Sequence, residues 1–236
     1  IKQAIQRNHS IHIYYISLSR IYSTLHNSTM AMSVLDSALN YDRSLSSVWI
    51  AKGDIHKTAE RYEAALQDYK IASSYSLDDW KGYYKQGVVL YYLGRLDSAQ
   101  FVLETALNKN PYQSEINHFL GLVYMAKNNP EMAKIFFSEA SQKDSLNSDI
   151  QFHLGQSYKH LEEFEKAKVA LENAVINDSS NAEALYTLGQ IYSKLALHNE
   201  SESILKKFKV VSDFKKTEKK LIKQLSLNPA DNNIRR

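Results

Sequence analysis

Apolar residues along this chain follow a helical spacing that stops at a short polar turn and then resumes. Within residues 114–147, the first apolar stretch contains Leu120, Val123 and Tyr124, and the second contains Met132, Ile135, Phe136 and Ala140. Apolar residues three or four positions apart share one face of an α-helix. Between the stretches, Asn129 can cap the second helix, and Pro130 suits its first turn because no backbone donor is lost there. The pattern therefore predicts a helix–turn–helix unit.

Small residues show that this unit recurs every 34 residues. Glycine holds one position of the period and alanine holds two others: Gly53, Gly87, Gly121, Gly155 and Gly189; Ala31, Ala65, Ala99, Ala133 and Ala167; Ala38, Ala72, Ala106, Ala140 and Ala174. Glycine inside a helix costs about 1 kcal/mol relative to alanine, so glycines in phase indicate two helices in close contact. Counting from His12, Ser46, Trp80, Ser114, Ser148 and Ala182 gives six units over residues 12–211. This period predicts an all-α solenoid in which each unit packs on its neighbours.

Both ends of the chain depart from the six regular units. Residues 1–11 resemble the end of a second repeat helix, and Ala4 lies one period ahead of Ala38. We expect them to form the end of a preceding repeat or an N-terminal capping helix. Residues 212–236 are expected to form a separate capping helix, with Ser212 or Asp213 as its N-cap, followed by a segment at 227–233 that resembles another repeat join. The sequence is therefore interpreted as a fragment of a longer protein.

The repeated residues resemble the signature of the tetratricopeptide repeat, which reads W-x2-L-G-x2-Y, then A-x3-F, then P over 34 residues. The fourth unit, for example, contains Leu120-Gly121-x2-Tyr124 and Ala133-x3-Phe137. The resemblance implies a right-handed superhelix whose inner face is lined by the first helix of each pair. Lys52, His56 and Gln86 depart from the signature because they occupy positions that are usually apolar. We expect these three residues to loosen the second repeat.

Inner-face positions in the third to fifth repeats are rich in apolar and aromatic side chains. Including residues of the sixth repeat, the predicted partner-binding residues are Tyr84, Val88, Tyr91, Tyr92, His118, Phe119, Leu122, Met125, Phe152, His153, Gln156 and Tyr186, and the predicted groove rim is Lys81, Lys85, Lys159 and His160. An apolar groove edged by cations suits an amphipathic helix or an extended peptide. The alternatives are ordinary packing between repeats and self-association through the aromatic face.

Charge is distributed unevenly along the chain. The whole sequence has a formal net charge of +3, but residues 205–236 carry ten Lys or Arg against three Asp or Glu. We interpret this basic segment as a solvated helix that covers the open apolar edge of the last repeat, as solenoids require. An anionic partner, either nucleic acid or a membrane surface, is the alternative interpretation. No apolar run is long enough to cross a bilayer, and the sequence indicates no compartment.

Residues that could carry out chemistry are not arranged for it in this sequence. The chain has no cysteine, no HxxxH or HExxH spacing and no glycine-rich phosphate loop. His118 and His153 face inward, but a metal site would need a third ligand, and nothing orders a nucleophile, base and acid. We predict a non-catalytic scaffold for a protein or peptide partner, with no catalytic residue, metal, cofactor or small-molecule substrate. The alternative is a regulatory or substrate-presenting arm of a larger enzyme.

Overall fold

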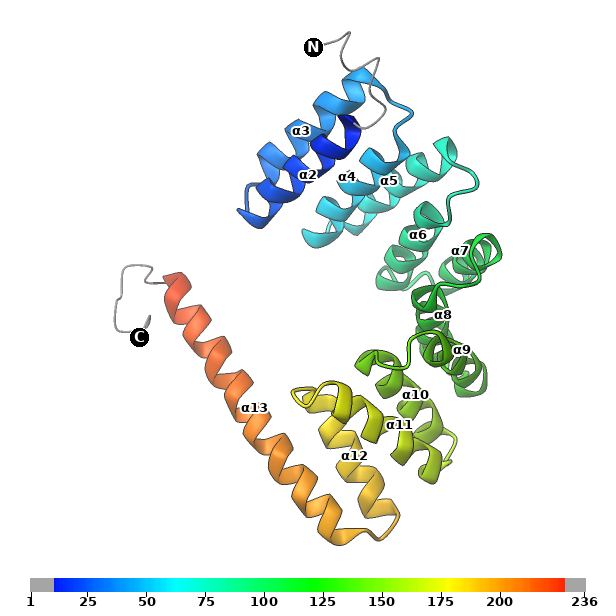
Figure 1. Ribbon diagram of the computed structural model, residues 1–236, viewed down its shortest axis with the longest axis vertical. Helices are drawn as coiled ribbons and strands as arrows, with labels where there is room; N and C mark the ends of the chain where they lie inside the picture. The colour runs from blue at the N-terminus through cyan, green and yellow to red at the C-terminus, as the bar shows by residue number, and fades with distance from the viewer. Residues whose placement is uncertain (1–10, 228–236) are drawn as a thin grey trace. The chain divides into compact units, whose positions relative to one another are not determined.

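The structure, a computed structural model, describes residues 11–227 of the chain and contains twelve α-helices and no strand in this range (Figure 1). The helices are α2 (Ile11–Thr24), α3 (Ser28–Tyr41), α4 (Ser46–Thr58), α5 (Tyr62–Tyr75), α6 (Trp80–Tyr92), α7 (Leu96–Lys109), α8 (Ser114–Ala126), α9 (Pro130–Lys143), α10 (Ser148–His160), α11 (Phe164–Asn177), α12 (Ala182–Lys194) and α13 (His198–Leu227). The expected all-α repeat architecture is confirmed. The helix expected within residues 1–11 falls almost entirely outside the described residues, and so does the repeat join expected after Leu227.

The chain divides into two compact units, residues 1–127 and 128–236. In each unit, the first helices of successive repeats pack against one another: α2 contacts α4, α4 contacts α6 and α6 contacts α8 in unit 1, and α10 contacts α12 in unit 2. Second helices of neighbouring repeats show no comparable packing within residues 11–227. Because first helices are the more closely spaced, they lie on the inner side of the curve within each unit. Their side chains are the ones that can line a concave surface.

Four of the phased glycines, Gly53, Gly87, Gly155 and Gly189, lie where the two helices of a repeat touch. A Cβ added to Gly155 in α10 would lie 2.6 Å from Cγ of Leu171 in α11, and one added to Gly189 in α12 would lie 2.6 Å from Cδ2 of Leu205 in α13. Leu171 is fully buried and cannot move aside without repacking its neighbours. The helices therefore approach more closely than any other residue would allow, as the sequence predicted.

Each turn between the two helices of a repeat contains a residue in the left-handed backbone conformation. One residue in each turn has a positive φ, between 56° and 71°: His26, Glu60, Gly94, Asn128, Glu162 and Ala196. In the second repeat, the amide of Glu60 donates to the carbonyl of Lys57 (2.9 Å), and the amide of Arg61 donates to that of His56 (2.9 Å). This pair of bonds is the Schellman motif, which satisfies the last carbonyls of a helix and reverses the chain. Only one of the six positions holds glycine, the residue that adopts this conformation without strain.

Side-chain caps fix the starts of several helices. The Asn129 side chain accepts a hydrogen bond from the Met132 amide (3.0 Å), and Pro130 occupies the first turn of α9. We expect Asn129→Ala to lower the free energy of unfolding by about 1 kcal/mol, because an amide of the first turn would lose its partner. Urea unfolding followed by circular dichroism measures this loss. Gln113→Ala is the control, since Gln113 precedes α8 without a side-chain cap bond; an equal loss in both variants would contradict the assignment.

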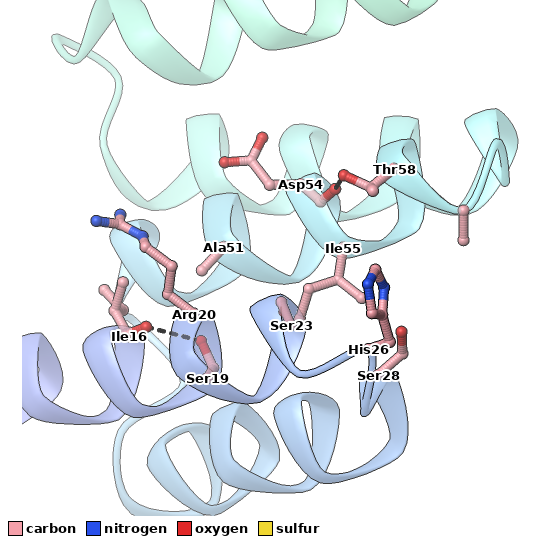
Figure 2. A pocket seen from close by; sticks show the side chains of 11 residues that line it. Ile16, Ser19, Arg20, Ser23, His26, Ser28, Ala51, Asp54, Ile55 and Thr58 are labelled. Atoms are coloured by element: carbon pink, nitrogen blue, oxygen red, sulfur yellow. Dashed lines mark hydrogen bonds between the residues drawn. The ribbon is translucent and has the colours of Figure 1, made fainter. Parts of the chain in front are cut away.

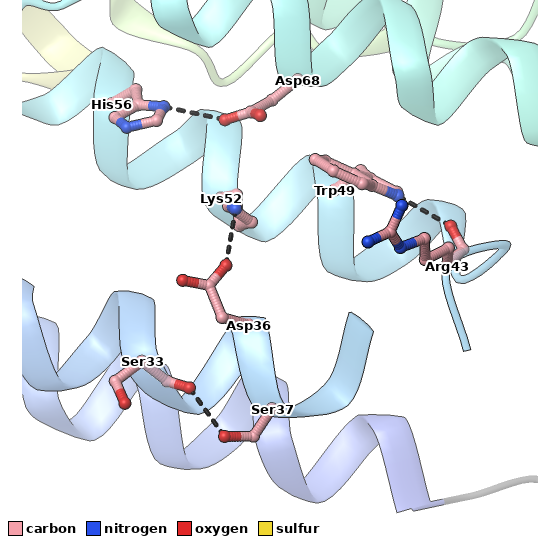
Figure 3. Close-up of polar contacts among 8 residues, drawn as sticks. All are labelled: Ser33, Asp36, Ser37, Arg43, Trp49, Lys52, His56 and Asp68. Carbon is pink, nitrogen blue, oxygen red and sulfur yellow. Dashed lines mark hydrogen bonds and ion pairs between the residues drawn. The ribbon is translucent and has the colours of Figure 1, made fainter. Parts of the chain in front are cut away.

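The three polar residues expected to loosen the second repeat are instead paired across helices, and Figure 3 shows the pairs of Lys52 and His56. Lys52 Nζ lies 2.7 Å from Asp36 Oδ1, and His56 Nδ1 lies 2.8 Å from Asp68 Oδ2. Gln86 Nε2 donates to Ser73 Oγ at 2.8 Å. Among the described residues, no buried side-chain nitrogen or oxygen lacks a hydrogen-bond partner. The expectation of a loosened repeat is therefore replaced by a bonded polar network, because each polar side chain meets a complementary one on the facing helix.

The C-terminal segment differs from the expectation of a separate capping helix. No break or N-cap occurs at Ser212 or Asp213, because α13 is continuous from His198 to Leu227 and contains neither glycine nor proline. Its first half covers the last repeat: Ile204, Leu205 and Phe208 pack in the hydrophobic core of unit 2. Residues 213–224 are all exposed. The most basic part of the helix therefore does not provide the predicted apolar cover.

Candidate functional site

Aromatic side chains on α6 and α8 form a connected cluster in unit 1. The ring centroid of Phe119 lies 5.8 Å from that of Tyr84 and 6.2 Å from that of Tyr91, both edge-on. Tyr92 lies 5.6 Å from Tyr91, and His118 lies 5.8 Å from Phe119. These five residues, here named the aromatic face, include most of the aromatic residues that the sequence predicted for the binding site. Edge-on geometry stabilises such pairs by about 0.5–1.5 kcal/mol beyond burial.

Exposure differs across the aromatic face. Tyr92 is 53% exposed, whereas Tyr84, Tyr91, His118 and Phe119 are half-buried. Burial raises the pKa of the Tyr84 phenol and also the pKa of the Tyr91 phenol, so both rings are neutral at pH 7. The face therefore presents uncharged rings with polar hydroxyl groups at one end.

Two residues predicted to line the groove are part of the core. Val88 and Phe152 are each only 4% exposed. Phe152 belongs to the hydrophobic core of unit 2, together with Leu185 and Leu188 of α12. The sequence pattern misplaced Val88 and Phe152 because neighbouring first helices pack against one another and cover part of their inner face. Leu122, Met125 and Gln156 are half-buried.

The cations predicted for the groove rim differ in their surroundings. Lys85 Nζ lies 2.7 Å from Asp54 Oδ1, and the Tyr69 hydroxyl donates to the same oxygen at 2.7 Å. Lys85 is therefore neutralised by a carboxylate within unit 1. Lys81 is exposed on the first turn of α6, so its charge remains accessible to solvent.

A cavity of about 790 Å³ in unit 2 brings three predicted site residues together. Lys159 and His160 line it from α10, Tyr186 and Gln190 from α12, and Leu205 from α13. Lys159 Nζ donates to Gln190 Oε1 at 2.6 Å, and the Tyr186 ring lies 5.2 Å from that of Phe208. His153 lies elsewhere on α10: its ring stacks on that of Phe137, and burial lowers its pKa, so it is uncharged at pH 7.

A second cavity, of about 380 Å³, lies between α2 and α4 and was not among the predicted sites (Figure 2). Ile16, Arg20 and Ser23 line it from α2, and Asp54 and Ile55 line it from α4. The sequence could have indicated this cavity, because Arg20 and Asp54 occupy the same inner-face position in successive repeats. Arg20 is exposed, whereas Asp54 is already bonded to Lys85 and Tyr69. The cavity can thus accept a polar side chain.

Residues 11–227 contain neither a metal-binding cluster nor a membrane-spanning helix. Within that range no three His, Cys, Asp or Glu side chains lie close enough to hold a metal ion. In the same range, each helix is either too short or too polar to cross a bilayer.

Comparison with known protein families identifies the repeat. Family models described as tetratricopeptide repeat match residues 50–111 and, in three further segments, residues 114–142, 148–178 and 182–208. Among curated proteins, anaphase-promoting complex subunit 3 of Schizosaccharomyces pombe is 24% identical over 123 residues, which cover 52% of this chain and 18% of that protein. This chain thus matches less than a fifth of the length of that relative.

Solved structures share the fold at low sequence identity. The APC/C hetero-tetramer Cut9–Hcn1 matches with a TM-score of 0.74 and 15% identity, covering 90% of this chain and 42% of that one. PilF of Pseudomonas aeruginosa matches with a TM-score of 0.74 and 18% identity, covering 94% of both chains. YrrB, described as a TPR protein with an unusual peptide-binding site, matches with a TM-score of 0.62 and 18% identity, covering 75% of this chain and 91% of that one. At these identities the likeness shows the fold alone.

Proposed function

Because this chain belongs to the tetratricopeptide repeat family, we propose that it is a non-catalytic scaffold that binds a protein segment on the inner helices of repeats three to five. The occupant is an amphipathic helix or an extended peptide with apolar anchors. In unit 1, we assign this contact to the aromatic face of α6 and α8. In unit 2, we assign it to the cavity beside Lys159 of the fifth repeat, which also reaches Tyr186 of the sixth. The neighbours described as peptide-binding (YrrB) and as part of a hetero-tetramer (Cut9) are in line with a protein partner.

The observation that carries this proposal is the aromatic face itself. Its rings contact one another on two adjacent inner helices, and Tyr92 remains 53% exposed. Rigid aromatic side chains that combine an apolar body with a polar tip are typical anchors at protein interfaces. Covering about 400 Å² of apolar surface at about 25 cal/mol per Å² supplies about 10 kcal/mol before the costs of association. Those costs offset several kcal/mol, so we expect micromolar affinity.

Peptide selection followed by mutagenesis tests this proposal. Peptides of about twelve residues would be selected on the wild-type chain from a display library. We expect Tyr91→Ala combined with Phe119→Ala to weaken binding of the selected peptides at least tenfold, because both ring anchors are lost. Fluorescence anisotropy measures the affinities.

Tyr112→Ala is the matched control, since Tyr112 is 83% exposed in the turn before α8, away from the aromatic face. Circular dichroism checks that each variant is folded. Unchanged affinity in the folded double variant would place the binding site elsewhere. Failure to select any peptide would contradict peptide binding altogether. Phe152 is left unchanged because it is part of the core.

A further inference from the structure

The second half of α13 is a solvent-exposed helix. Residues 213–224 are all exposed, although the same helix is packed against α12 further back. Large apolar side chains remain open to solvent on it: Val210 is 71% exposed, Phe214 69%, Leu221 42% and Ile222 59%. Four such side chains within thirteen residues leave an apolar surface that the repeats do not cover.

The exposed apolar residues form a stripe with helical spacing. Val210, Phe214 and Leu221 follow one another at four and seven residues, with the small Thr217 between the last two. At about 100° per residue, this stripe lies on the side of α13 opposite to Ser201 and Phe208. Those two residues face the last repeat: Ser201 donates to the Gly189 carbonyl at 2.9 Å, and Phe208 contacts Tyr186. The last repeat therefore has no access to the stripe.

Lysines occupy the rest of the surface of this segment. From Lys206 to Lys223 the chain has eight lysines against Asp213 and Glu218. The helical spacing places Lys216 and Lys219 on the side away from the stripe and Lys220 at its flank. A helix with an apolar stripe and a lysine-rich polar face lies in the interface of an anionic membrane. The helix is too polar to cross a bilayer.

We propose that the distal part of α13, residues 210–224, binds an anionic lipid surface. Phe214 and Leu221 enter the boundary between headgroups and acyl chains, and the surrounding lysines attract acidic headgroups. Charge complementarity favours this occupant, and so does the composition of the helix. α13 contains no arginine, the side chain that binds phosphates bidentately, and Phe214 is the one aromatic side chain among its exposed large apolar residues. A nucleic acid would neutralise the lysines but leave the apolar stripe in water, whereas an anionic lipid surface satisfies both.

Vesicle co-sedimentation with the whole chain tests the proposal. The probes are vesicles of phosphatidylcholine alone and vesicles in which about a third of the lipid is phosphatidylserine, which supplies the negative surface. We expect binding to the anionic vesicles only. Phe214→Glu combined with Leu221→Glu is expected to weaken it at least tenfold, because charged side chains oppose insertion. Lys216→Gln, Lys219→Gln and Lys220→Gln together are expected to weaken it to a similar extent.

The matched control is Phe101→Glu, because Phe101 is 71% exposed on α7 in unit 1 and has no lysine-rich surroundings of this kind. It should bind anionic vesicles like the wild type. Circular dichroism confirms that the variants keep their helix content. Equal binding to both kinds of vesicle, or no binding to either, overturns the proposal. Loss of binding in the lysine variant alone, or tighter binding to single-stranded DNA than to vesicles, would show a purely electrostatic surface and overturn it as well.

Discussion

Replacing His56 with alanine is expected to lower the free energy of unfolding by about 1–3 kcal/mol at pH 7, the cost of leaving a largely buried carboxylate without its hydrogen-bond partner. His56 Nδ1 lies 2.8 Å from Asp68 Oδ2, and both side chains are largely buried between α4 and α5. Without the imidazole, the Asp68 carboxylate loses its hydrogen bond while remaining shielded from water. Urea unfolding at pH 7 measures the loss.

The pH dependence separates this cause from a simple packing defect. Burial raises the pKa of Asp68, while the hydrogen bond from His56 lowers it; removing His56 therefore raises that pKa further. A carboxyl group whose pKa is higher in the folded state destabilises the protein as pH rises through that pKa. At pH 7 we expect His56→Ala with Asp68→Asn to be more stable than His56→Ala alone. The difference should shrink as pH falls below the folded-state pKa of Asp68 and disappear once pH falls below the pKa that Asp68 has in the unfolded chain.

The exposed ion pair between Lys206 and Glu202 supplies the control for this experiment. Glu202→Ala is expected to leave the unfolding midpoint nearly unchanged, because exposed pairs are screened by water. If His56→Ala proves equally harmless, the polar network of the second repeat contributes nothing to stability. A defect in His56→Ala that is the same at every pH, with no gain from Asp68→Asn, would instead indicate lost packing.

Gly155→Leu is expected to destabilise unit 2 by about 1–3 kcal/mol, because the new side chain would occupy the space of Leu171. A Cβ alone would lie 2.6 Å from Leu171 Cγ and 2.9 Å from its Cδ2. Leu171→Ala alone should cost about 2–5 kcal/mol through the cavity it leaves. Combined, the two changes should cost less than their sum, because the added side chain fills that cavity. Urea unfolding of the four proteins gives the coupling energy.

Asn173→Leu is the control for adding a leucine to a helix, since Asn173 is exposed on α11. It should change stability little. Simple additivity of Gly155→Leu and Leu171→Ala would mean that the two positions do not share one space, and the packing explanation of the phased glycines would be wrong.

The close helix contacts were predictable from the sequence because they recur. Gly155 and Gly189 hold the same position in successive units, and one physical cause, close approach of two helices, explains both. The α-helical class and the helix–turn–helix unit follow from the same periodicity. Such contacts can be predicted from sequence because the residues that make them recur at a fixed interval.

Contacts that occur only once were not predictable in the same way. His56 and Gln86 each break the apolar pattern, and nothing in the spacing indicates that Asp68 and Ser73 lie opposite to them. Phe152 occupies an inner-face position, but α12 covers it. The sequence interpretation began a new helix at Ser212 or Asp213 because either residue can act as an N-cap. In the structure α13 continues through both residues, since no glycine or proline ends the preceding helix. The aromatic face of α6 and α8 could be predicted from the inner-face positions of the repeat alone, because its rings come from neighbouring first helices.

The left-handed turns have a consequence for engineering this protein. Glu60, Glu162 and Ala196 hold a positive φ at the same point of their repeats, where Gly94 stands in the third. Holding a residue with a side chain in this conformation costs about 1–2 kcal/mol. The same cost is present at the equivalent position of several repeats. Replacing these residues with glycine or asparagine, one repeat at a time, would therefore raise the melting temperature in steps and leave the surfaces of the inner helices unchanged.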